Sequence, residues 1–201
     1  MYVPDWFRVT DQDTILRVIR NNSFATLVTV LDGVPVASHV PVVIEAEDPL
    51  VLVAHIAAKN PQATCLDGAG TMLVVFSGPH AYVSPRDYET SPNVPTWNYV
   101  AVHATGVPQR IDDTSQLDSM FEKLVSEFDP ELKADAPENT SLDFYRPKYP
   151  GIVAFRMVVD KLEAKAKLSQ NKPDRDRLKV AQVLQSSSEP DRQRLGKLMG
   201  G

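Results

Sequence analysis

The segment AHIAAKNPQ (54–62) places one cation and two side-chain amides directly after a run of apolar residues. Lys59, Asn60 and Gln62 are its donors, and Asn60 before Pro61 is a pattern typical of a helix start. A helix N-terminus carries unpaired N–H groups and a partial positive charge, so this segment could hold an anion such as a phosphate. The alternative, which the spacing alone favours, is that Asn60 only caps the helix while Lys59 is solvated.

A second polar group interrupts VPTWNYVAVHATG (94–106), which otherwise resembles a core strand and also contains His103. Trp97 could stack on a planar ligand, and Asn98 could bind the polar edge of that ligand. The alternative is a tryptophan of the core, with Asn98 serving a turn.

A third polar group is KAKLSQNK (165–172), near the end of a predicted strand. Strand alternation puts Lys165 and Lys167 on one face, and Ser169, Gln170 and Asn171 follow. The alternative is a solvated strand end, which is the usual structure of such a run.

The four histidines do not form a recognisable metal motif. His39, His55 and His103 fall in predicted strands and His80 in a predicted turn, with no HxH or HExxH pattern and no pair of cysteines. Histidines satisfied by hydrogen bonds in the core are therefore favoured over a metal site. There is also no nucleophile elbow, Walker loop or GxGxxG motif, so the sequence identifies no catalytic residue.

Composition narrows the class of protein. The 201 residues are 43% hydrophobic and 23% charged, with a net charge of −5, which works against nonspecific binding to nucleic acid. Residues 161–179 are the exception, with seven basic and three acidic side chains. No apolar run reaches the roughly 18–20 residues of a membrane helix. We expect no export signal, and the single Cys65 fits a reducing cytoplasm.

The predicted elements are mostly strands. A short helix capped by Thr10 should end at Asn21-Asn22, and Asp32-Gly33 is typical of a hairpin turn. An amphipathic helix is predicted from 115 to 128, and further helices follow Lys172 and Pro190. GPHAYVSP (78–85) is predicted to turn, and 129–149 to form a surface loop. The predicted strands are 24–30, 34–44, 50–56, 71–77, 96–107 and 151–168.

This pattern predicts a mainly β fold with peripheral helices. The strands follow one another with short connections, so the sheet should be largely antiparallel. Because few helices are available to cover it, we expect the sheet to close on itself or to pair with another sheet, and a barrel would leave no exposed edge.

Several segments together carry a family resemblance that covers roughly residues 1–185. The chain resembles the PaiB family of FMN-binding transcriptional regulators, which belongs to the FMN-binding split-barrel superfamily. The segments are MYVPDWF, NSFATLVT, VPVASHVPVVI, AHIAAKNPQ, VVFSGPHAYVSPRDY, VPTWNYVAVHATG and KAKLSQNKPDRDR.

The resemblance implies a homodimer of split β-barrels with FMN in a groove between the chains. The domain would span 1–170, followed by a helical extension over 171–201. The FMN phosphate is expected at 57–60, where Ala58 replaces an arginine common in the family, and the isoalloxazine along 36–39. The cofactor-binding residues implied are Ser38, His39, His55, Lys59, Asn60, Gln62, Trp97, Asn98, His103, Lys167, Ser169 and Gln170.

Three functions remain open. The resemblance implies a flavin-dependent negative transcriptional regulator, whose contact with DNA would use the basic stretch 161–179. A small FMN-dependent oxidoreductase is the alternative, with His39 or His103 as acid–base residue and the redox chemistry supplied by the flavin. A haem-binding protein with a histidine ligand is the third possibility.

Overall fold

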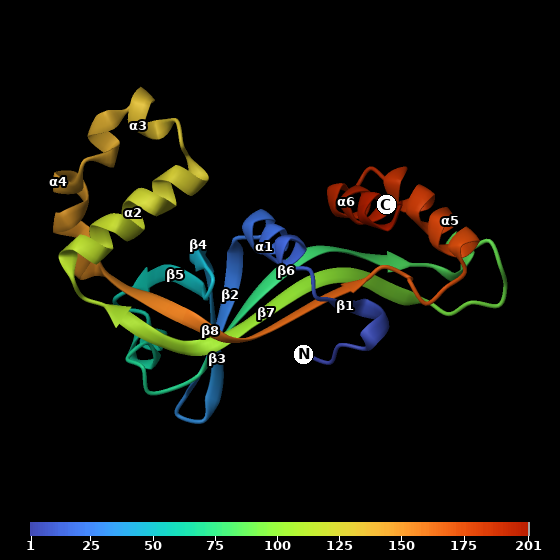
Figure 1. Ribbon diagram of the computed structural model, residues 1–201, viewed down its shortest axis with the longest axis horizontal. Helices are drawn as coiled ribbons and strands as arrows, with labels where there is room; N and C mark the ends of the chain where they lie inside the picture. The colour runs from blue at the N-terminus through green and yellow to red at the C-terminus, as the bar shows by residue number, and fades with distance from the viewer. Residues whose placement is uncertain (201) are drawn as a thin grey trace. The chain divides into compact units, whose positions relative to one another are not determined.

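The structure is a computed structural model that describes residues 1–200, and its main element is one eight-stranded antiparallel sheet (Figure 1). The strand order is β3-β2-β6-β7-β8-β5-β4, and β1 pairs with β8. The strands are β1 (Arg8–Val9), β2 (Phe24–Leu31), β3 (Val34–Pro41), β4 (Val43–Glu47), β5 (Leu50–Ala57), β6 (Met72–Val83), β7 (Thr96–Ile111) and β8 (Ile152–Lys167).

Helices lie between and after the strands. The α-helices are α1 (Gln12–Asn21), α2 (Thr114–Phe128), α3 (Leu132–Asp135), α4 (Leu142–Tyr145), α5 (Asp174–Gln185) and α6 (Pro190–Gly200). The 3-10 helices are η1 (Asp5–Phe7), η2 (Pro61–Cys65), η3 (Pro85–Asp87), η4 (Pro137–Thr140) and η5 (Arg146–Gly151).

The mainly β, antiparallel fold class is confirmed, but the sheet is not closed. Its order has two ends, β3 and β4, and no ladder joins them among residues 1–200. Pro35 and Pro41 lie in β3, where an edge strand tolerates the loss of two backbone donors. Within one chain the barrel is therefore split, because its two end strands are not joined by a ladder.

The hairpin between β2 and β3 follows from its two turn residues. Asp32 and Gly33 have φ angles of 51° and 79°, the left-handed conformations that a two-residue hairpin turn requires. The strands pair in register from Phe24 opposite Pro41 to Leu31 opposite Val34.

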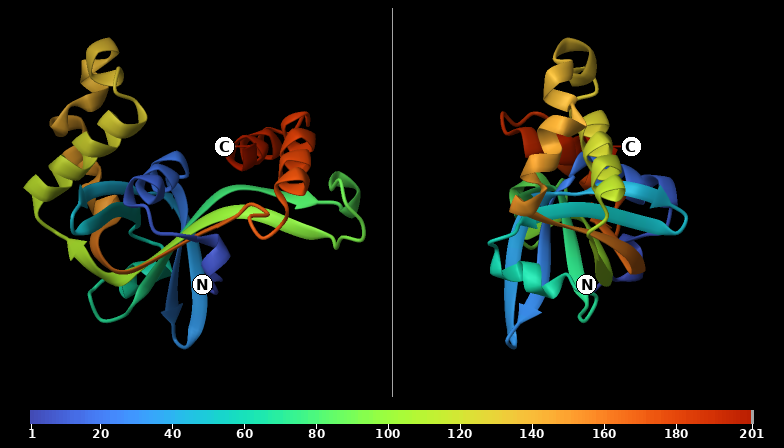
Figure 2. Two further views of the ribbon diagram at one scale, coloured as in Figure 1. Left: turned by 45° about the vertical axis from the view of Figure 1, so that its right-hand side comes forward. Right: turned by 90° about the vertical axis from the view of Figure 1, so that its left-hand side faces the viewer.

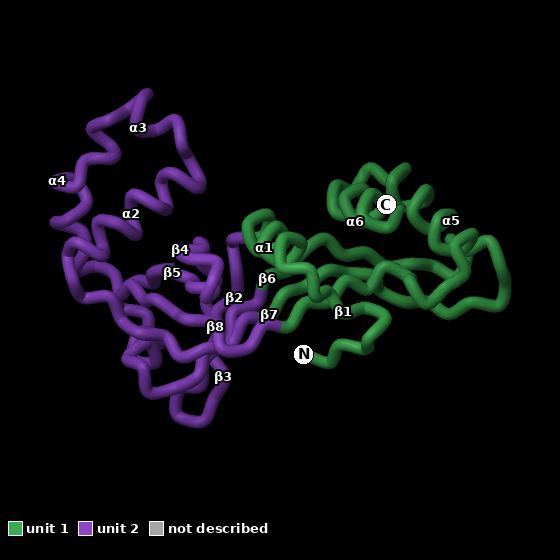
Figure 3. The backbone as a smooth tube through the Cα atoms, viewed as in Figure 1, with its two compact units in different colours: residues 1–22, 76–103, 163–201 green, residues 23–75, 104–162 purple. Residues whose placement is uncertain are grey.

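The chain divides into two compact units (Figure 3). Unit 1 contains 1–22, 76–103 and the chain from 163 onward; unit 2 contains 23–75 and 104–162. Strands β6, β7 and β8 contribute residues to both. The division at 170 expected from the sequence stays a prediction.

Each unit has its own apolar core. In unit 2, Leu117, Met120 and Leu124 of α2 are buried together with Val43 and Val53 of β4 and β5. In unit 1, the core joins Ala81 and Val83 of β6 to residues of α5 and α6, which lie side by side (Figure 2).

Three local predictions were wrong, each for a structural reason: the cap of α1, the GPHAYVSP turn, and the loop 129–149, which is described below. The α1 cap is Asp11, whose carboxylate accepts from the Thr14 N–H. GPHAYVSP continues β6 as far as Val83, which puts His80 in a strand. Its Gly78 is present because β7 passes close by: a Cβ there would lie 3.1 Å from Val100.

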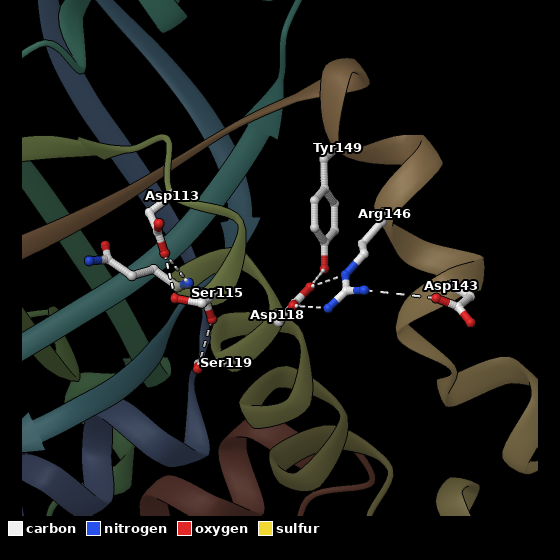
Figure 4. Close-up of polar contacts among 8 residues, drawn as sticks. Asp113, Ser115, Asp118, Ser119, Asp143, Arg146 and Tyr149 are labelled. Atoms are coloured by element: carbon white, nitrogen blue, oxygen red, sulfur yellow. Dashed lines mark hydrogen bonds and ion pairs between the residues drawn. The ribbon is translucent and has the colours of Figure 1, made fainter.

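The predicted loop 129–149 forms several short helices that are anchored to α2 (Figure 4). The Tyr149 hydroxyl donates to Asp118 Oδ1 at 2.7 Å, and Arg146 donates to both oxygens of the same carboxylate at 2.8 and 3.3 Å. These bonds to Arg146 and Tyr149 hold the pKa of Asp118 below its usual value. Phe121 also stacks on the Tyr145 and Tyr149 rings at 5.1 and 5.2 Å. These long-range contacts order a segment whose sequence shows no helical periodicity.

Candidate functional site

In unit 2, the structure joins β3 to the segment that follows β5. The Asn60 side-chain amide donates to the Ser38 hydroxyl at 2.8 Å. Gln62 is buried and donates from Nε2 to the Thr29 hydroxyl at 3.0 Å, with the Leu27 and Val36 carbonyls at 3.3 and 3.4 Å. Three predicted cofactor residues, Ser38, Asn60 and Gln62, therefore meet at one corner of unit 2.

The helix predicted after Asn60 is only a short 3-10 helix, and the phosphate site expected there stays a prediction. The element after Asn60 is the five-residue 3-10 helix η2, and Asn60 Oδ1 accepts the free N–H of Gln62 at 3.0 Å. The preceding Ala58 N–H donates to the Gly151 carbonyl. What remains free to bind an anion is the exposed Lys59 ammonium and the hydrogen of the Ser38 hydroxyl.

The two predicted histidines of unit 2 have different surroundings. His39 is exposed, and its Nδ1 lies 3.0 Å from the Thr26 hydroxyl on the neighbouring strand. His55 packs on the Phe121 ring, with 5.5 Å between ring centroids, and burial lowers its pKa. The Nδ1 atom of His55 has no hydrogen-bond partner.

In unit 1, Trp97 is the centre of an exposed aromatic group. Its side chain is 54% exposed, so the alternative of a core tryptophan was wrong. The rings of His80 and Tyr82 flank it, with centroids at 6.0 and 6.2 Å. The sequence analysis missed these two residues because GPHAYVSP was interpreted as a turn. In a strand, His80 and Tyr82 share one face.

Asn98 points the opposite way from Trp97, as adjacent residues of a strand must. It is fully buried, and its Nδ2 donates to the Ser169 hydroxyl at 2.9 Å. Its Oδ1 has no partner. Ser169 has a φ of 63°, a left-handed conformation in the turn after β8. Asn98 itself lies within β7, and its bond to Ser169 holds the turn that follows β8.

Lys167, at the end of β8, contacts the first residues of β7. Its ammonium donates to the Trp97 carbonyl at 2.6 Å and to the Thr96 hydroxyl. Burial, together with the charges of Lys165 and Lys172, lowers its pKa. Lys172 in turn donates to Asn93 at 2.7 Å.

These residues surround a small cavity of about 140 Å³ in unit 1. Its lining residues are Tyr88, Val94, Thr96, Asn98, Lys167, Ser169, Asn171 and Lys172. The unpartnered Asn98 oxygen and two ammonium groups are its main polar features.

The last two predicted residues of unit 1 lie elsewhere. Gln170 closes its own turn, since its side chain accepts from Leu168 N at 2.7 Å and donates to the Ala166 carbonyl at 2.6 Å. His103 is partly buried in β7, and this burial is the main cause of its lowered pKa.

Residues 1–200 contain neither a metal centre nor a membrane-spanning helix. No group of three or more histidine, cysteine, aspartate or glutamate side chains is placed to hold a metal ion. No helix in this part of the chain combines the length and apolar character needed to span a membrane.

Solved structures share this fold at low sequence identity. The flavocytochrome Anf3 from Azotobacter vinelandii superposes with a TM-score of 0.66 at 14% identity, over 82% of this chain and 72% of that chain. The FAD and heme binding protein from Mycobacterium smegmatis superposes with a TM-score of 0.64 at 18% identity, over 80% and 73%. The fold is therefore that of the split-barrel flavoproteins.

Sequence comparison gives the family. Residues 1–161 match the family described as "Putative FMN-binding domain". The chain is also 34% identical over 203 residues to the protease synthase and sporulation protein PAI 2 of Bacillus subtilis (strain 168), covering 99% of this chain and 96% of the relative. The chain belongs to this PaiB-type FMN-binding family, which confirms the family and the cofactor, FMN, predicted from the sequence.

The side chains present fit an FMN molecule in kind. A flavin offers a flat apolar ring system, carbonyl acceptors, one N–H donor and a phosphate dianion. The exposed Trp97 ring suits the first, and Lys59, Lys167 and the Ser38 hydroxyl suit the acceptors and the phosphate.

Proposed function

We propose that this protein is a flavin-dependent regulatory protein of the PaiB type. Family membership over most of the chain carries the proposal. The related PAI 2 protein is named for protease synthesis and sporulation, which favours a regulatory role over a metabolic one. The single free cysteine favours a cytoplasmic location.

Within this function, Trp97 would contact the flavin ring, and Lys59, Lys167 and Ser38 would supply donors to its carbonyl and phosphate oxygens. The other predicted residues would complete the site or position these side chains: His39, His55, Asn60, Gln62, Asn98, His103, Ser169 and Gln170. The bonds from Asn60 to Ser38 and from Lys167 to the Trp97 carbonyl support such a positioning role.

We further propose that the protein is a homodimer with FMN between the chains. One face of the β2–β3 ribbon in unit 2 exposes two large apolar side chains of β2: Phe24 is 70% and Val30 61% exposed. A second copy of the chain would remove this surface from water, which is the usual function of an apolar patch on a sheet.

Contact with DNA is the part of the proposal that the structure supports least. Several cations of 161–179 are engaged within unit 1: Lys165 is buried, Lys172 bonds to Asn93, and Arg177 bonds to the Met199 carbonyl. A basic face for phosphate contacts would therefore contain fewer free charges than the sequence indicates.

The test of this function is the visible absorption of the purified protein during titration with FMN, with light scattering on a size-exclusion column. We expect a shifted flavin spectrum on a particle of twice the chain mass. Bleaching of the flavin by NADH or NADPH with steady turnover would favour the oxidoreductase, and a Soret band would favour the haem protein. A colourless monomer that leaves free FMN unchanged would contradict the proposal.

FMN affinity should depend on pH through Lys167. Its ammonium loses its proton at a lower pH than an ordinary lysine, because burial and two neighbouring lysines disfavour the charge. The phosphate is a dianion above about pH 7. We therefore expect the FMN dissociation constant to rise about tenfold as the pH increases through the lowered pKa of Lys167, before an ordinary lysine would lose its proton, because the charge that pairs with the phosphate is lost.

The control for this profile is Lys167→Arg, because a guanidinium stays charged throughout. Fluorescence titration of FMN should give a flatter profile for Lys167→Arg than for the wild type. Parallel profiles for the two proteins would show that Lys167 does not bind the flavin.

A further inference from the structure

A cavity of about 520 Å³ in unit 1 has no role in the function proposed above. It lies between α1 and α6, which both belong to unit 1 (Figure 3), and strands β6 and β7 complete it. The cavity is within the range of small-molecule sites, roughly 300–1,000 Å³. Its lining residues are Thr14, Arg17, Val18, Asn21, Asn22, Pro79, Val100, Arg194, Lys197 and Leu198.

Helix α1 faces this cavity with a stripe that is separate from its core face. Thr14, Arg17, Val18 and Asn21 follow the i, i+3, i+4, i+7 spacing of one helix side. The core side of the same helix is formed by other residues, such as Ile19, which is 1% exposed. The cavity is therefore not a defect in the packing of the α1 core face.

Helix α6 contributes in the same way. Arg194, Lys197 and Leu198 share one side of the helix, whereas Leu195 and Met199 are buried in the unit 1 core. Leu198 remains 52% exposed although it is a large apolar residue. A ligand in the cavity would cover it.

The lining has two chemically distinct parts. We call Val18, Pro79, Val100 and Leu198 the apolar wall, and Arg17, Arg194 and Lys197 the basic group. None of the ten residues that line the cavity in the described chain is acidic. Arg194 pairs with Asp191 of the same helix at 3.9 Å, and both side chains are largely exposed. The basic group thus gives this cavity a positive charge, although the chain as a whole has a net charge of −5.

We propose that the α1–α6 cavity binds a small amphipathic organic anion, with its apolar part on the apolar wall and its acidic head on the basic group. Arginine forks bind carboxylate and phosphate heads equally well in geometry, so the shared class is an apolar body with one acidic group. Such a ligand would connect an N-terminal helix to a C-terminal helix. Its binding would therefore also stabilise unit 1 against unfolding.

The experiment is calorimetric titration of the FMN-loaded protein with decanoate and, separately, with decyl phosphate; decylamine and decanol are the controls. We expect at least one of the two anions to bind about tenfold more tightly than either control and to raise the melting temperature. Tighter binding of decanoate or of decyl phosphate identifies the head group. Equal binding of all four probes, or binding of none, would overturn the proposal.

A charge-matched pair of double variants locates the site. Arg194→Gln with Lys197→Gln removes two cations of the basic group; Arg175→Gln with Lys179→Gln removes two exposed cations of α5. We expect the first to weaken binding of the tighter-binding anion about tenfold and the second to leave it within about twofold. If both double variants lost affinity for the anion equally, the cause would be the overall charge of the protein, and the proposed site would be contradicted. Arg17→Gln, on the other helix, provides an independent variant if the first double variant is unstable.

The same titration tests whether the α1–α6 cavity is separate from the FMN site. Release of flavin fluorescence on addition of decanoate would show that the cavity is part of the flavin site, and the proposal would then be wrong. If the protein binds no FMN at all, the proposed function fails, but the titration and its variants still test this cavity on the FMN-free protein.

Discussion

Gly106→Ala is expected to lower the free energy of unfolding by about 3 kcal/mol, because β7 and β8 leave no room for a methyl group at this position. A Cβ there would lie 2.2 Å from the Val158 carbonyl oxygen and 2.9 Å from Met157 Cγ. The nearer atom is backbone, so relief requires moving a strand of the sheet. Thermal unfolding followed by circular dichroism should show a melting temperature about 10 °C below that of the wild type.

Gly70→Ala is the matched control for this variant. A Cβ at Gly70 meets no atom within 4 Å, and its φ is not in the left-handed region. Its melting temperature should stay at or slightly above the wild-type value, since alanine restricts the unfolded chain. Equal stability of the two variants would mean that β7 and β8 do not approach as closely as the structure has them.

Local signals in the sequence predicted local structure well. The β2–β3 hairpin was predictable because its two turn residues alone determine the left-handed backbone. The α2 helix was predictable because its apolar side repeats with the helical period. The family resemblance, rather than any periodicity, supplied the cofactor.

The errors arose where tertiary contacts override local patterns. Gly78 suggested a turn, although its true cause is the approach of Val100 from the neighbouring strand. The segment 129–149 lacks periodicity and is ordered by Arg146 and Tyr149 bonding to a carboxylate on α2. Neither contact can be inferred from residues close in sequence.

In the candidate site, too, local features were predictable from the sequence and tertiary contacts were not. That Trp97 and Asn98 face opposite sides was predictable from strand alternation alone. That Asn98 is buried against Ser169, 71 positions along the chain, was not, because it depends on where α5 and α6 pack. The flanking rings of His80 and Tyr82 became apparent only when GPHAYVSP proved to be a strand.

Trp97→Ala is expected to weaken FMN binding about thirtyfold, the loss of one aromatic face stacked on a flat heterocycle. Trp97 is large and more than half exposed, and its backbone carbonyl accepts a bond from Lys167 that the substitution leaves in place. The loss should therefore appear in flavin affinity without a comparable loss of stability. Fluorescence titration of FMN measures the first, and thermal unfolding without FMN measures the second.

The matched control is Trp6→Ala, because Trp6 is the other tryptophan of the chain and is 70% exposed in η1. It should bind FMN within about twofold of the wild type, since an exposed side chain outside the site contributes little. Trp97→Phe separates stacking from size: a smaller aromatic ring retains a stacking face and should recover most of the lost affinity. If Trp97→Ala and Trp6→Ala bind FMN equally, the flavin does not stack on Trp97. The aromatic group in unit 1 would then be a surface for another partner.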